Sequence, residues 1–134
     1  EDRGILLRDI LEQGVDEKYY LSDKLITNFL TRKSAKSFPF KPMNNDSEKC
    51  PTLTARYFKM SATDPYIKEP VRIGQFNSGG QGVRKLTPIE CERLQSLPDN
   101  YTEGVSNTQR YKALGNAFNV EVVAHILKQI IKLL

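Results

Sequence analysis

The sequence has few of the residues that build metal sites, disulfide frameworks and hydrolytic active sites. It contains one histidine, His125, and two cysteines, Cys50 and Cys91, among 134 residues. Two cysteines cannot form a disulfide framework, and one histidine gives no zinc site with the usual ligand spacing. The same scarcity removes the standard Ser-His-Asp and Cys-His nucleophile arrangements. We therefore expect a reducing, cytoplasmic environment, no bound metal and no self-contained hydrolytic site.

Long hydrophobic runs and a visible targeting segment are also missing. No run approaches the roughly 20 apolar residues that span a bilayer, and no basic region followed by an apolar stretch opens the chain. The 39% of hydrophobic residues suits one soluble domain with a modest core. Because the sequence opens on Glu1 rather than methionine, we also expect that it is part of a longer protein.

The positive charge lies mainly in the middle of the chain. The net charge is −4 for residues 1–23, +8 for residues 24–85 and 0 for residues 86–134. A basic block of this kind favours a polyanionic partner such as nucleic acid. The alternative is a lysine-rich surface that is only solvated, and charge by itself leaves both open.

The first half of the chain mixes short helices with irregular segments. Residues 5–11 predict a short helix or turn, and Ser22 is a plausible N-cap for the helix that follows it. An exposed loop is expected over residues 32–47, because its two prolines oppose a helix.

Alternation and β-forming side chains predict a strand over Thr52–Met60. A further strand is expected over Val71–Phe76. The glycine-rich stretch Ser78–Gly82 lacks the Lys-Ser/Thr ending of a phosphate loop, so we interpret it as a hinge or a close approach to a partner.

The last third of the chain predicts helices. Thr87 and Glu90 form a capping box around a helix that contains Cys91, which we interpret as a core thiol. Ser106 begins a second helix, which is expected to end at Gly115. The segment Val120–Leu134 is apolar over most of a helical circumference, so it is expected to be buried in something larger.

Residue chemistry suggests one surface for nucleic acid. On the predicted strand, Thr52, Thr54 and Arg56 share one face, and Arg can read guanine through two hydrogen bonds. Surrounding lysines would attract the phosphate backbone. These lysines are Lys33, Lys36, Lys41, Lys49 and Lys59. The alternative is a polar, half-exposed strand face.

Other candidates are single residues. Asn116 follows Gly115 near the expected start of the last helix, where free N–H groups suit a polar ligand, although Gly-Asn is also a common helix end. Arg93 and Gln95 are interpreted as buried polar anchors between helices. Cys50 follows a lysine whose charge is expected to lower its pKa slightly.

Several segments resemble parts of the DNA cytosine-5 methyltransferase family. Arg84–Tyr101 (RKLTPIECERLQSLPDNY) is similar to the penultimate motif of the family, and Arg110–Val120 (RYKALGNAFNV) is similar to its final motif. Upstream, Thr52–Tyr57 (TLTARY) resembles the Thr-Leu element of the target-recognition region. Leu7–Leu11 with Tyr19–Ser22 resembles the segment leading into that region.

The resemblance implies a fold and a division of the chain. The family combines a Rossmann-like, SAM-binding α/β domain with a smaller lobe that reads double-stranded DNA. An α+β fragment is therefore expected, in which a small β-rich lobe is followed by C-terminal helices that pack onto the SAM-dependent domain. Residues 1–23 would lead in from the catalytic domain, residues 24–83 would form the target-recognition region, and residues 84–134 would complete the catalytic domain.

The resemblance also implies roles for single residues. Gly115, Asn116 and Ala117 match family positions that touch S-adenosyl-L-methionine (SAM), although many relatives have serine at the position of Ala117. In the family, the target base is flipped out of the duplex and attacked by a cysteine thiolate. The Phe-x-Gly-x-Gly, Pro-Cys, Glu-Asn-Val and Gln-x-Arg-x-Arg motifs are missing from this sequence. The chain is therefore expected to carry no catalytic residue, to need an N-terminal catalytic portion or subunit, and to be inactive alone.

Three functions follow from these observations. The first is DNA recognition and completion of the SAM pocket in a restriction-modification or phage cytosine-5 methyltransferase of a bacterial cytoplasm. The second is a non-catalytic DNA-binding or regulatory module with the same fold. The third is the tRNA-methylating branch of the family, whose ending is similar.

Overall fold

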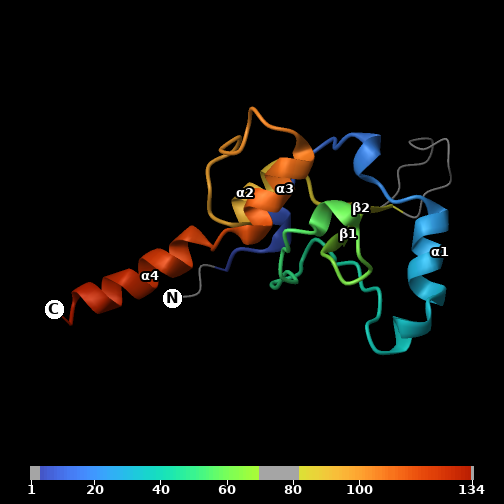
Figure 1. The fold of residues 1–134 in the computed structure, drawn as a ribbon, viewed down its shortest axis with the longest axis horizontal. Coiled ribbons are helices and arrows are strands. Elements are labelled where there is room, and N and C mark those ends of the chain that lie inside the picture. Colours follow the sequence, from blue (N-terminus) through green and yellow to red (C-terminus); the bar gives the residue numbers. More distant parts are fainter. Residues whose placement is uncertain (1–3, 70–81, 134) are drawn as a thin grey trace. The chain divides into compact units, whose positions relative to one another are not determined.

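A computed structural model describes residues 4–69 and 82–133 (Figure 1). The contacts divide the chain into two compact units. The first unit comprises Glu1–Thr52 and Met60–Thr87, and the second comprises Leu53–Lys59 and Pro88–Leu134. The predicted strand over Val71–Phe76 lies outside the described residues, as does the predicted hinge apart from its last glycine.

The first unit is built from short elements. Ser22 caps α1 through its hydroxyl, which accepts a hydrogen bond from the Leu25 amide, so the predicted helix start is confirmed. A 3-10 turn, η3, follows within the segment predicted as loop. The prolines that oppose a helix stand after this turn, which explains why one short turn forms before them. The elements are η1 (Leu7–Asp9), η2 (Glu17–Tyr19), α1 (Asp23–Thr31), η3 (Lys33–Lys36), β1 (Tyr66–Lys68) and β2 (Val83–Lys85).

The core of the first unit lies between α1 and the strands. β1 and β2 are antiparallel, with Ile67 opposite Arg84. Ile26 and Phe29, three residues apart on α1, are buried with Tyr66 of β1. The ring centroid of Phe40 lies 5.2 Å from that of Phe29 and 5.4 Å from that of Tyr66. This aromatic cluster joins a helix, a loop and a strand.

A buried arginine completes the small sheet. Arg84 is 0% exposed, and its Nε donates to Oε1 of Glu69 over 2.8 Å. The Tyr20 hydroxyl donates to Oε2 of the same carboxylate over 2.6 Å. The guanidinium in the interior is therefore paired, as a buried charge requires.

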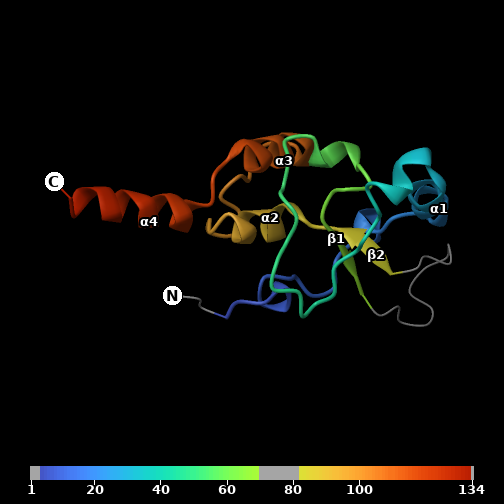
Figure 2. The ribbon, with the colours of Figure 1, turned by 90° about the horizontal axis from the view of Figure 1, so that it is seen from below.

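The second unit joins one short turn to three helices. They are η4 (Tyr57–Lys59), α2 (Pro88–Leu94), α3 (Asn107–Asn116) and α4 (Val120–Ile131). Figure 2 shows η4, in green, alongside α3, and the two elements are in contact. α2 also contacts α3, whereas α4 projects away from both (Figure 1).

The strand predicted over Thr52–Met60 is wrong. Residues 55 and 56 form a turn and Tyr57–Lys59 forms η4. Leu53 and Tyr57 are the buried members of the segment, and their spacing of four residues fits a helical turn as well as a strand. Short apolar patterns carry this ambiguity, and tertiary contacts resolve it.

The helices α2 and α3 begin where the sequence predicts. α2 starts at Pro88, and the Ser106 hydroxyl accepts from the Gln109 amide over 3.4 Å at the start of α3. α2 ends at Leu94. Within residues 4–69 and 82–133, no helix has both the length and the apolar character to cross a membrane.

Candidate cofactor and nucleic-acid surfaces

Gly115 allows α3 to approach the segment Leu53–Lys59 at backbone distance. A Cβ at residue 115 would lie 2.1 Å from the carbonyl carbon of Thr54 and 2.3 Å from the Ala55 amide nitrogen. No side chain fits such a gap, although glycine inside a helix costs about 1 kcal/mol relative to alanine. Gly115 therefore packs directly on the backbone of Thr54 and Ala55.

Aromatic contacts strengthen this packing. The rings of Tyr57 and Tyr111 are buried, with centroids 5.3 Å apart and planes at 81°. Beside them, Phe58 is half-buried and meets two cations. The Nζ atoms of Lys59 and Lys112 lie 5.8 Å and 5.4 Å from its ring centroid. η4 and α3 thus share an apolar contact flanked by positive charge.

The residues predicted to contact DNA are all exposed, but they divide between the two units. Thr54, Arg56 and Lys59 belong to the second unit, while Lys49 and Thr52 belong to the first. The turn before η4 replaces the expected pleat, so the threonines and Arg56 do not share a strand face. Exposure suits contact with a large ligand.

Asn116 is the last residue of α3 and is exposed. Its side chain makes no hydrogen bond with any residue that the structure describes. The amide that caps the last helix belongs instead to Asn119, whose Oδ1 accepts from the Val122 amide over 3.1 Å. Asn119 also donates from Nδ2 to the Leu94 carbonyl over 2.8 Å. Sequence reasoning placed Asn116 at the start of the last helix, and the structure gives that place to Asn119.

An ion pair between Glu92 and Arg110, which the sequence did not predict, connects α2 to α3. Glu92 is 0% exposed and accepts from Nη2 of Arg110 over 2.9 Å. It also accepts from the backbone amides of Asn100 and Thr102 over 2.7 and 2.8 Å, and from the Thr102 hydroxyl. Burial raises the pKa of Glu92, but the hydrogen bonds from Thr102 and Arg110 outweigh burial and lower its pKa overall.

The polar residues predicted to anchor this helix, Arg93 at the end of α2 and Gln95 just after it, have structural partners. Nε2 of Gln95 donates to the Leu114 carbonyl over 3.0 Å and so joins the end of α2 to α3. Arg93 binds both oxygens of Asp99 over 2.8 and 2.6 Å. Arg93 and Gln95 are half-buried, and Glu90 is fully buried.

Thr87 stands just before α2, and its hydroxyl donates to Oε2 of Glu12 within the first unit. Thr87 is itself buried, with 4% of its surface exposed. This contact ties the lead-in segment to the end of β2, which is a packing role that the capping-box pattern does not reveal.

The two cysteines have different environments. Cys91 is fully buried, which confirms the core thiol. Cys50 is half-buried, and burial raises its pKa to about 11. The expectation that the neighbouring lysine lowers this pKa is wrong, because loss of hydration disfavours the thiolate more than an exposed charge stabilises it. Among the residues that the structure describes, no cluster of three metal-ligating side chains occurs.

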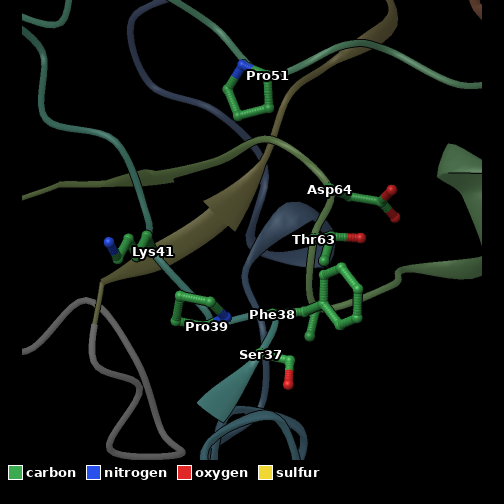
Figure 3. Close-up of a pocket in the computed structure, with 8 residues that line it drawn as sticks. Ser37, Phe38, Pro39, Lys41, Pro51, Thr63 and Asp64 are labelled. Carbon is green, nitrogen blue, oxygen red and sulfur yellow. The ribbon is translucent and has the colours of Figure 1, made fainter. Parts of the chain in front are cut away.

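A hollow of about 230 Å³ lies in the first unit. Figure 3 shows Phe38, Thr63 and Asp64 on one side of it and Lys41 on the other. Asp64 accepts from the Ser61 amide over 2.6 Å, and burial raises its pKa. None of the residues predicted to bind SAM lines this hollow.

Comparison with known proteins decides the family. The family model for C-5 cytosine-specific DNA methylases matches residues 2–132. The chain belongs to this family. The Type II methyltransferase M1.ScrFI of Lactococcus lactis subsp. cremoris is 37% identical over 131 residues, which are 94% of this chain and 31% of the relative. M.SsoII of Shigella sonnei is also 37% identical, over 94% of this chain and 32% of its own length.

The chain therefore spans about a third of the length of these curated methylases. Among solved structures, the Dnmt2 methyltransferase of S. pombe has a TM-score of 0.76 at 20% identity, over 98% of this chain and 43% of that one. The methyltransferase EhMeth of Entamoeba histolytica has a TM-score of 0.71 at 23% identity, over 95% and 40%. At such identities the likeness shows a shared methyltransferase fold.

The three residues predicted to contact SAM differ in the polar groups that they offer to a ligand. The exposed amide side chain of Asn116 has both a donor and an acceptor to offer. The Ala117 amide, in contrast, already donates to the Leu114 carbonyl over 3.3 Å. The missing side chain of Gly115 serves the contact with Thr54. Asn116 is thus the residue of the three that offers a side-chain donor and acceptor to a ligand.

Proposed function

We propose that this chain is the C-terminal part of a SAM-dependent DNA cytosine-5 methyltransferase of restriction-modification or phage type, acting in the cytoplasm. Residues 1–23 lead in from the catalytic domain, residues 24–83 recognise double-stranded DNA, and residues 84–134 complete the SAM pocket. The catalytic cysteine is supplied by an N-terminal portion, so the chain alone transfers no methyl group. SAM supplies the methyl group when it is bound.

The packing of Gly115 on Thr54 and Ala55 carries this proposal. It joins the segment that resembles the recognition element to the helix that resembles the cofactor motif. In such an enzyme, Asn116 would hold SAM through its amide, while Gly115 would keep α3 in place against the turn. The family match over residues 2–132 supports the same assignment.

The exposed apolar side chains of α4 suit a partner domain. Seven residues of this helix have between 38% and 68% of their surface exposed. They are Val120, Val122, Val123, Ile126, Leu127, Ile130 and Ile131. A contiguous apolar face of this kind marks an interaction site. We assign it to the N-terminal catalytic portion, which would bury these side chains.

The test begins with the DNA upstream of this reading frame. A Pro-Cys loop encoded there, in the same gene or an adjacent one, supplies the N-terminal portion for reconstitution. We expect the reconstituted complex to transfer radioactive methyl groups from SAM to duplex DNA, and the chain alone to transfer none. A Pro-Ser version of the loop is the control and should be inactive.

Two results would contradict the proposal. If no Pro-Cys loop is encoded upstream, the chain is a DNA-binding or regulatory module without chemistry. If the reconstituted complex methylates tRNA and leaves duplex DNA unmodified, the assignment to DNA is wrong.

A further inference from the structure

The segments that contain η4 and α3 carry positive charge and no negative charge. These segments, 53–59 and 104–120, contain no Asp or Glu and four basic residues. Arg110 is neutralised by the buried Glu92. The other three, Arg56, Lys59 and Lys112, are exposed and form no ion pair within the described residues.

Two of these cations lie near the ring of Phe58. The Nζ atoms of Lys59 and Lys112 lie 5.8 Å and 5.4 Å from its ring centroid. The ring attracts each ammonium group, but the two ammonium groups repel each other. An anion bound beside them would remove that repulsion, and no carboxylate of segments 53–59 or 104–120 can supply it.

The turn η4 is also rigidly tied to α3. The buried rings of Tyr57 and Tyr111 pack edge to face, and Gly115 lies on the Thr54 and Ala55 backbone. The backbone positions that carry these cations on η4 and α3 therefore keep their spacing, which lowers the entropy cost of ordering the side chains around a ligand. Neutral donors flank them, among them the exposed side chains of Thr54 and Thr108.

We propose that Arg56, Lys59 and Lys112 form a clamp for the sugar-phosphate backbone of duplex DNA, carried by the second unit. In this arrangement Arg56 contacts a phosphate and does not read a base. The clamp places DNA contacts on the same rigid element as Asn116. The inference rests on the proposed function, because it takes DNA as the substrate, and it adds the site and chemistry of contact.

The test is the salt dependence of DNA binding by the full chain. Binding to two fluorescent duplexes of unrelated sequence is measured by anisotropy between 50 and 200 mM NaCl for Lys59→Gln, Lys112→Gln and Arg56→Gln. Each substitution should lower the slope of log Kd against log salt by about 0.9, as expected for one lost phosphate contact. Each should also weaken binding to both duplexes by the same factor.

Lys18→Gln is the matched control, because it removes the same charge from a lysine already paired with Asp16 at 3.3 Å. It should leave the slope unchanged. The three substituted side chains are exposed, so circular dichroism should show unchanged melting. Unchanged slopes for Lys59→Gln and Lys112→Gln would overturn the clamp. So would a slope change found with tRNA and not with duplex DNA. A change in base preference caused by Arg56→Gln would overturn the role of Arg56.

Methyl transfer by the wild-type reconstituted complex separates the two proposals. If wild-type protein methylates DNA while the lysine variants bind with the wild-type slope, the clamp is wrong and the proposed function stands. If the wild-type complex methylates no DNA, the proposed function is wrong, whatever the slopes.

Discussion

Gly115 of α3 lies against the peptide that joins Thr54 to Ala55, so closely that a Cβ would stand 2.1 Å from the Thr54 carbonyl carbon. The segment Thr52–Met60, which alternation predicted to be a strand, makes this contact as a turn followed by η4. It also explains why the turn before η4 groups with the C-terminal helices and not with the residues that precede and follow it in the chain.

Gly115→Ala should destabilise the protein. The added methyl group meets backbone atoms that cannot rotate away, and overpacking of this kind costs about 1–3 kcal/mol. Helix propensity acts in the opposite direction, favouring alanine by about 1 kcal/mol. Urea unfolding should therefore show a lower free energy of unfolding for Gly115→Ala. The control is Ala113→Gly on the exposed side of the same helix, which loses propensity alone. If Gly115→Ala is instead more stable than wild type, the close approach is absent.

The ion pair between Glu92 and Arg110 should contribute strongly to stability. Arg110→Met leaves a fully buried carboxylate without its cation, and such changes cost about 3–5 kcal/mol. The double variant Glu92→Gln with Arg110→Met should recover part of this loss in urea unfolding, because no charge is then buried. Equal stability of the single and double variants would show that the two side chains do not interact.

The same carboxylate should make stability depend on pH. The net pKa of Glu92 is lowered below the ordinary value of 4.5, so the unfolded chain binds this proton more readily than the folded chain. Its contribution is complete above pH 4.5 and is lost as the pH falls through the lowered pKa. Between pH 7 and pH 3, the melting temperature should fall less steeply with decreasing pH for Glu92→Gln than for wild type. If the melting temperature of both proteins falls equally with pH, the lowered pKa of Glu92 is not a source of the pH dependence.

Cys50 should react slowly with iodoacetamide. Because burial raises its pKa to about 11, little thiolate is present at pH 8. In a Cys91→Ala background, mass spectrometry should show alkylation of folded protein rising steeply toward pH 11. The same protein in urea should react faster at pH 8, as its thiol regains an ordinary pKa. Equal rates at pH 8 for folded and unfolded protein would contradict the burial argument.

Alanine substitutions at Asn116 and Asn119 should have different effects, the first on SAM binding and the second on stability. Asn116→Ala should weaken SAM binding to the reconstituted complex in calorimetry while leaving the melting temperature unchanged, because this exposed side chain has no partner among the described residues. Asn119→Ala removes the N-cap of α4, which costs about 0.5–2 kcal/mol. It should therefore lower stability. An unchanged SAM dissociation constant for Asn116→Ala would show that this residue does not contact the cofactor.

Local signals in the sequence were sufficient to predict the starts of α1, α2 and α3. Ser22 and Ser106 each cap the helix that follows, and Pro88 opens α2, because capping depends on residues within one turn. The helical character of Val120–Ile131 also follows from its pattern. The segments resembling the two last family motifs identified the family, which the match over residues 2–132 confirms.

Partners distant in sequence were not predictable in the same way. Glu92 and Arg110 are 18 residues apart, and Arg84 pairs with Glu69 across 15 residues. In each case the sequence shows a charged residue that is normally exposed, and only packing reveals that Glu92 and Arg84 are fully buried against a partially buried partner. The strand prediction over Thr52–Met60 was wrong for a related reason, because alternation over so few residues fits a turn equally well.

The sequence by itself determined the family, the starts of α1, α2 and α3 and the scarcity of metal-binding and hydrolytic residues, because these depend on residue identity and short spacing. Tertiary structure decided what each candidate residue does. It made Gly115 a packing contact, gave the cap of α4 to Asn119, raised the pKa of Cys50 and brought Lys59 and Lys112 to one ring. Backbone approach, burial and charge spacing arise only when distant segments pack, so no local pattern contains them.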